Sequence, residues 1–157
     1  MFKKLRIAIL LLILVNVGVG AWLARARTTS WERPPHVRMF VVFHDPKLTT
    51  TVPHSLGLQR GLIGVVHVFA SDEQTAQNKV VVAHELLHTV GATDKYGPAT
   101  NLPRFPDGYG DPQQQPLLPQ RFAEIMAGRI AVSSTEAEMP ADLGAVVVGA
   151  ATAREIN

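Results

Sequence analysis

The sequence predicts an α+β fold: a small twisted mixed sheet with one long helix against it and a C-terminal helix, preceded by one N-terminal transmembrane helix. Residues 37–44 and 62–70 are rich in β-branched and aromatic residues, which is typical of strands. Across residues 72–90 the apolar residues recur instead at helical spacing. A chain of 157 residues suits a single folded domain. We therefore expect an anchor, a linker and one domain, at residues 1–27, 28–36 and 37–157.

The composition excludes several classes of protein. Because the chain has no cysteine, it has no disulfide, no thiolate metal ligand and no cysteine nucleophile. Its formal net charge is only +2, and the basic residues form no stripe along the predicted domain. We therefore expect no nucleic-acid partner.

The first 27 residues carry a membrane signal. Basic residues precede an apolar run at residues 7–23, and a helix of that length spans about 25 Å, slightly less than the ~30 Å hydrocarbon core of a bilayer. A secretory signal would share these features, and Ala24 and Ala26 would fit its cleavage site. Because the run is longer than the core of a usual signal, we expect a single-pass membrane anchor. The domain is then exported to a periplasm or the cell exterior, and secretion after signal cleavage is the alternative.

The segments around the predicted strands and helix differ in character. Residues 28–35 are polar and include two adjacent prolines, so we interpret them as a linker. Residues 46–61 show no clear periodicity and are either a loop or a weak strand. For the helix at residues 72–90, Ser71 is the expected N-cap and Gly91 the residue that ends the helix.

The C-terminal half is irregular by composition. Six prolines lie within residues 92–119, which predicts a long loop. A short element is expected around residues 120–130. Pro140 suits the first turn of a helix and opens an apolar stretch, so we expect a C-terminal helix packed on the domain.

The predicted helix carries the pattern His84-Glu85-Leu-Leu-His88. Residues four apart lie on one helix face, so both imidazoles can bind one ion while Glu85 reaches a water molecule on it. Catalytic zinc usually has three protein ligands and an open position for water. Gly91 allows a sharp turn, after which Asp94 can return toward the imidazoles. The pattern therefore predicts one Zn2+ ion bound by His84, His88 and Asp94, with Glu85 as the catalytic base.

The whole string from His84 to Asp94 resembles the metzincin group of zinc metallopeptidases, in the snapalysin-like variant whose third ligand is aspartate. The resemblance implies a metzincin-like zincin fold with a Met-turn beneath the metal, and Met126 within residues 124–128 fits that turn. It also implies an edge strand that aligns the substrate, a place similar to that of residues 62–70. One departure is Gly128, which stands where some metzincins have a tyrosine after the Met-turn.

Several of these residues have alternative interpretations. Asp94 can cap the turn after the helix instead of binding metal. Glu124 is then the alternative third ligand, by resemblance to the gluzincins. Met126 can be an ordinary core residue. Tyr96 and Tyr109 are possible oxyanion stabilisers, although a packed loop aromatic is the simpler interpretation for each.

Two aspartates of the proline-rich loop form a second, weaker pattern. Asp107 and Asp111 flank glycines and would suit a calcium ion, but a plain turn explains them as well.

The sequence thus predicts an exported, membrane-tethered zinc metalloendopeptidase that hydrolyses peptide bonds with a zinc-activated water. Its expected partners are a peptide or protein substrate and the membrane that holds its N-terminal helix. The alternative is a non-catalytic zinc-containing binding module with a degenerate peptidase cleft. The sequence identifies neither the substrate nor the oligomeric state.

Overall fold

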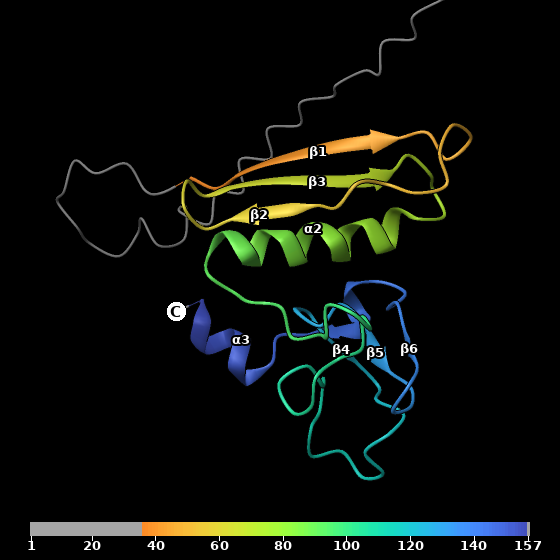
Figure 1. The fold of residues 1–157 in the computed structure, drawn as a ribbon, viewed down its shortest axis with the longest axis vertical. Coiled ribbons are helices and arrows are strands. Elements are labelled where there is room, and N and C mark those ends of the chain that lie inside the picture. Colours follow the sequence, from red (N-terminus) through yellow and green to blue (C-terminus); the bar gives the residue numbers. More distant parts are fainter. Residues whose placement is uncertain (1–35, 157) are drawn as a thin grey trace, which may run out of the picture.

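A computed structural model describes residues 36–156 (Figure 1). The predicted anchor at residues 1–27 and nearly all of the linker at 28–36 lie outside the described residues. Within residues 36–156, none of the helices combines the length and the apolar character needed to cross a bilayer.

The sheet has three strands in the order β1-β3-β2. Strand β1 (Arg38–His44) runs parallel to β3 (Ile63–Phe69), and β2 (Leu56–Leu58) pairs with β3 in the antiparallel sense. The two strands predicted from composition are confirmed, and the segment without periodicity contains the short strand β2. The interpretation of residues 62–70 as an edge strand is wrong, because β3 is hydrogen-bonded on both sides and β1 and β2 form the two edges of this sheet.

Helix α2 (Thr75–Thr89) lies against this sheet (Figure 1). It begins three residues later than predicted, because residues 72–74 form turns and Gln74, not Ser71, is the N-cap residue. The Ser71 hydroxyl donates to the Glu73 carboxylate instead of capping the helix. At the other end Gly91 adopts φ 107°, a left-handed conformation that glycine adopts without strain, and turns the chain away from the helix.

Helix α2 is covered on two sides. Toward the sheet, a cluster of buried residues on β1 and β3 packs against apolar side chains of α2, namely Met39, Val66 and Val68 against Val81, Val82 and Leu86. On the other side, Val80 packs with Ala92, Ile125 and Met126 of the C-terminal half. The helix is therefore held between the sheet and the irregular half of the molecule (Figure 1).

The irregular half contains short elements only. Strand β4 (Ala123–Glu124) pairs with β7 (Val146–Val147), and β5 (Ile130–Ala131) pairs with β6 (Ala137–Glu138). The chain ends with the 3-10 helix η1 (Leu143–Ala145) and helix α3 (Ala150–Glu155).

The prediction of one continuous helix from Pro140 is wrong. Asp142 caps η1 by accepting a hydrogen bond from the Gly144 backbone nitrogen at 2.7 Å. The next residues are extended because β7 pairs with β4, and α3 begins only after Gly149. Pairing between distant segments therefore overrides the local apolar pattern.

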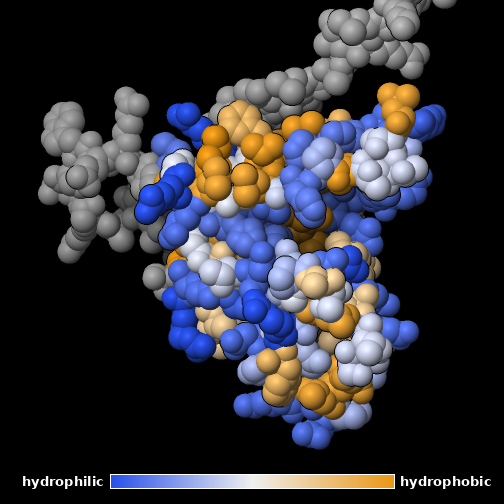
Figure 2. All heavy atoms as spheres, viewed as in Figure 1, coloured by the Kyte–Doolittle hydropathy of each residue, from blue (hydrophilic) through white to orange (hydrophobic). Residues whose placement is uncertain are grey.

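The surface of the domain is mixed in character. In the view of Figure 2, hydrophobic side chains gather over the sheet and again over the irregular half, and many hydrophilic side chains lie between them. The exposed apolar residues include Phe43, Leu56 and Leu58 on the sheet and Phe105 and Phe122 in the irregular half.

Candidate metal centre

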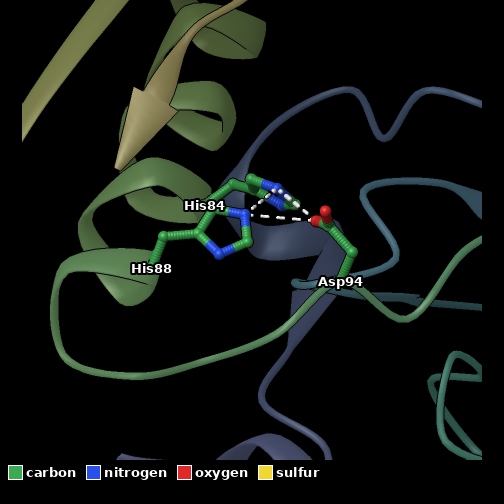
Figure 3. A group of neighbouring side chains, drawn as sticks. All are labelled: His84, His88 and Asp94. Atoms are coloured by element: carbon green, nitrogen blue, oxygen red, sulfur yellow. Dashed lines mark hydrogen bonds and ion pairs between the residues drawn. The ribbon is translucent and has the colours of Figure 1, made fainter. Parts of the chain in front are cut away.

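Three side chains converge where α2 meets the following loop (Figure 3). His84 and His88 extend from the same face of α2, and their Nε2 atoms are 3.1 Å apart. The Asp94 Oδ1 atom lies 3.2 Å from Nε2 of His84 and 3.1 Å from Nε2 of His88. Within residues 36–156, these are the three residues whose donor atoms cluster closely enough to hold a metal ion. The predicted ligand set is therefore brought together.

A hydrogen bond from the Nδ1 atom of each imidazole fixes its orientation. Nδ1 of His84 donates to the Ile125 carbonyl oxygen at 2.8 Å, and Nδ1 of His88 donates to the Ala92 carbonyl oxygen at 2.8 Å. A neutral imidazole that donates through Nδ1 carries its lone pair on Nε2. Carbonyl partners of this kind orient metal-binding histidines and make them better ligands.

The spacing of the three atoms suits zinc. In a tetrahedral site with Zn–N and Zn–O distances near 2.0–2.2 Å, ligand atoms lie about 3.3 Å from one another. Moreover, Asp94 Oδ1 is buried and has no hydrogen-bond partner among residues 36–156, and its polar neighbours are the two Nε2 atoms at 3.2 and 3.1 Å. A buried carboxylate oxygen without a partner is costly. A cation between the three atoms removes that cost, so the residues present fit the ion.

The electrostatics of the cluster favour positive charge at the same point. Burial alone lowers the pKa of His84, but the Asp94 carboxylate, the Ile125 carbonyl and the charge of Glu85 outweigh burial and raise it above its ordinary value. Interaction with His84, above all, holds the pKa of Asp94 below its ordinary value, and His88 acts in the same direction. Asp94 is therefore ionised at neutral pH and available to a cation.

Glu85 lies beside the centre and is buried, with 8% of its surface exposed. Its pKa is raised, mainly by burial, while the imidazoles and the Gly57 amide oppose the rise. Gly57 on β2 is in close contact with α2: a Cβ atom there would lie 2.3 Å from the Glu85 carbonyl oxygen and 2.6 Å from Cβ of His88. The edge strand can approach the helix because this position has no side chain.

The loop that carries Asp94 is held by the C-terminal helix. The Glu155 carboxylate accepts hydrogen bonds from the backbone nitrogen and the hydroxyl of Thr93, both at 2.9 Å, and pairs with Lys95 Nζ at 2.7 Å. Glu155 therefore binds the residues on both sides of Asp94. Arg104 adds a hydrogen bond from its guanidinium to the Asp94 carbonyl oxygen at 2.9 Å.

Met126 and Glu124 lie in the turn beneath His84. Met126 is fully buried against α2, and its carbonyl oxygen accepts a hydrogen bond from the Lys95 backbone nitrogen at 2.9 Å. Met126 is therefore a core residue, and its role as a Met-turn stays a prediction.

Glu124 is not a third ligand, in contrast to the alternative raised from sequence. Its buried carboxylate accepts from the backbone nitrogens of Met126, Ala127 and Gly149 and from the Thr152 hydroxyl, at 2.7–3.1 Å. These bonds tie the turn to the start of α3. Because its oxygens already have four donors, Glu124 is a structural carboxylate.

The two tyrosines differ in position. Tyr96 borders a pocket of about 250 Å³ together with the three ligands and Glu85, and its ring centroid lies 6.5 Å from that of His84. Burial and the nearby Asp94 charge raise the pKa of Tyr96, so its hydroxyl keeps its proton and can donate. Tyr109 instead packs edge-on against Phe105, outside this pocket, and is therefore unsuited to the oxyanion role.

The two aspartates considered for calcium, Asp107 and Asp111, belong to no cluster of metal-binding side chains within residues 36–156. Asp111 Oδ1 accepts from the Gln113 backbone nitrogen at 3.0 Å, which is a local turn. The plain-turn interpretation is the one that these contacts favour.

Several features of the site are absent from the sequence prediction. The Ile125 and Ala92 carbonyls are main-chain groups, and no side-chain pattern reveals them. Glu155 follows Lys95 by 60 residues, so its contact with the ligand loop has no local signal. Gly57 is the exception, because a glycine between two leucines is a recognisable sign of close backbone approach in a strand.

The fold and the site together define a small α+β domain with a candidate mononuclear His-His-Asp metal centre. No protein-family model matches the chain, and no curated protein and no solved structure matches it. Its function is therefore argued from its own residues.

Proposed function

We propose that this protein is a zinc-dependent peptidase, with His84, His88 and Asp94 as metal ligands and Glu85 as general base and acid. The observation that carries the proposal is the mutual approach of the two Nε2 atoms and Asp94 Oδ1, at 3.1–3.2 Å, together with the burial of that Oδ1 atom without a hydrogen-bond partner in the described part of the chain. The resemblance of the string from His84 to Asp94 to the metzincins supports the same assignment.

The chemistry follows from what each side chain can do. A zinc ion held by the three ligands would polarise a water molecule and the scissile carbonyl group. Glu85, buried next to the ligands with a raised pKa, is suited to accept a proton and to return it to the leaving amine. Tyr96, which borders the same pocket, is suited to donate a hydrogen bond to the oxygen that becomes negatively charged.

The edge strand supplies a way to align a peptide. Within the described residues, β2 pairs with β3 on one side only. An extended peptide can add to such an edge through main-chain hydrogen bonds, which recognise any sequence. Ser55, Leu56 and Gly57 border the same pocket as the ligands, so a peptide bound there would run past Glu85.

The test compares the full-length protein with its Glu85→Gln variant, both purified in mild detergent. We expect both to bind one zinc ion, measured by elemental analysis, and only the parent to cleave a mixed peptide library. Zinc bound without cleavage by the parent would instead favour the non-catalytic binding module. Absence of bound metal in both proteins, together with thermal stability unaffected by a chelator, would refute the metal centre itself.

We also propose that residues 1–27 export the domain and hold it at a membrane. The support is the apolar run after basic residues in the sequence. Fractionation of cells that express the full chain tests this proposal: the protein should sediment with membranes and be digested by protease added from outside. Recovery of a shortened protein in the medium would indicate signal cleavage instead.

A further inference from the structure

A second, larger pocket of about 430 Å³ adjoins the metal centre. It shares His54, Ser55, His84, Glu85 and Tyr96 with the smaller pocket around the candidate ligands. Its other walls combine apolar side chains with polar ones, among them Val80, Val81, Met139, His67 and Arg129. A peptide whose scissile bond lies at Glu85 would therefore place a neighbouring residue at this pocket.

Arg129 is the permanently charged side chain of this pocket wall. It is half-buried, and its guanidinium forms no hydrogen bond or ion pair with any residue in the range 36–156. The acidic residue of the lining is Glu85, which lies at the metal centre. A guanidinium that is partly removed from water and lacks a carboxylate partner favours an anionic ligand.

Two histidines besides His84 add hydrogen-bonding groups to this wall. They are His54 and His67, which both line the pocket. Burial and the neighbouring His44 lower the pKa of His67, which is therefore neutral at pH 7 and still offers a ring nitrogen for hydrogen bonding. The wall thus presents one fixed positive charge and a neutral imidazole, that of His67, and its one carboxylate, Glu85, lies at the metal centre.

We propose that Arg129 binds a carboxylate of the substrate in this pocket, next to the scissile bond, and so determines specificity. The carboxylate belongs either to an aspartate or glutamate side chain or to the free C-terminus of the substrate, since both present the same two oxygens to a guanidinium. The inference rests on the proposed peptidase function, and it adds a substrate class: acidic peptides.

The experiment uses the full-length zinc-loaded protein and matched peptides. In one arm, peptides with amidated ends carry Glu, Gln or Lys at each of the two residues that flank the scissile bond. In the other arm, peptides without acidic side chains end in a free carboxylate or an amide. We expect kcat/KM about tenfold to a hundredfold higher for Glu than for Gln in the first arm, or for the free carboxylate in the second. The arm that shows the preference identifies the source of the carboxylate.

Variants of Arg129 assign the effect to this residue. Arg129→Gln should abolish the preference while zinc content stays at one ion, Arg129→Lys should retain part of it, and Arg129→Glu should reverse it toward Lys peptides. Arg121→Gln is the matched control, because Arg121 is exposed and does not line the pocket. It should leave the preference intact.

Two results would overturn the inference in different ways. The role of Arg129 is refuted if acidic and neutral peptides are cleaved efficiently and at equal rates in both arms. It is also refuted if the preference for acidic peptides survives in Arg129→Gln. Either result leaves the peptidase proposal standing. Failure of the zinc-loaded parent to cleave any peptide refutes the peptidase proposal, and the inference with it.

Discussion

Replacing Glu155 by glutamine tests whether the C-terminal helix holds the third ligand in place. The carboxylate receives hydrogen bonds from Thr93 on one side of Asp94 and from Lys95 on the other. Each carboxylate oxygen accepts from both Thr93 and Lys95. Glutamine keeps one such oxygen, but its amide nitrogen accepts from neither residue and its neutral side chain no longer pairs with the Lys95 charge, so the ligand loop is held more weakly on both sides of Asp94. We expect the fold to persist and the Asp94 loop to become mobile.

The magnitude follows from the number and exposure of these contacts. Loss of an outer-shell partner typically weakens metal binding 10–100-fold. The Glu155 side chain is 31% exposed, so water replaces part of what is lost, and we expect the lower end: zinc Kd about tenfold weaker, or about 1.4 kcal/mol. Competition with a fluorescent zinc chelator measures this constant directly.

Comparing zinc affinity with stability distinguishes positioning of Asp94 from a role of Glu155 in the fold alone. Glu136→Gln removes an exposed carboxylate and should leave zinc affinity unchanged. If Glu155→Gln lowers the stability of the metal-free protein in urea while its zinc Kd equals that of the parent, the carboxylate serves the fold alone. The positioning argument is then wrong.

Three further predictions concern Glu155, Gly57 and Glu124. The pKa of Glu155 lies below its ordinary value of 4.5, chiefly because of Lys95, so its contribution to stability is present above about pH 4.5 and is lost as the pH falls through the lower folded value. The free energies of unfolding of the parent and of Glu155→Gln, measured in urea, should therefore converge in acid. A difference that persists in acid contradicts the assignment. Gly57→Ala places a Cβ atom 2.3 Å from a backbone oxygen of α2, so the free energy of unfolding should fall by about 1–3 kcal/mol and peptide cleavage should be slower. Gly110→Ala, in the proline-rich loop, is the control and should leave the cleavage kinetics of the folded fraction unchanged. Glu124→Gln leaves a network of four donors incomplete, three of whose hydrogen bonds are buried, and should cost about 3 kcal/mol in urea unfolding. A cost below about 0.5 kcal/mol would show that water satisfies those donors.

The candidate ligands could be predicted from the sequence because they lie close together along the chain. Residues four apart in a helix must lie on one face, so the imidazoles of His84 and His88 had to be neighbours. Asp94 follows Gly91 by three residues, and the left-handed conformation of that glycine returns the chain toward the helix. The strands β1 and β3 were also predictable, since their β-branched composition belongs to their own segments.

Contacts between distant segments were decided by the tertiary structure alone. Residues 140–149 have a helical apolar pattern, yet only a short 3-10 helix forms there and Val146–Val147 pair as β7 with β4, because the backbone hydrogen bonds of a partner strand outweigh a weak local preference. Likewise, Glu124 is a carboxylate of suitable type for a metal, but its donors come from α3 and its own turn. The sequence by itself determined which residues could hold a metal ion. The tertiary structure decided what holds those ligands in place, since the Ile125 carbonyl and the Glu155 carboxylate reach the site through space from residues far along the chain.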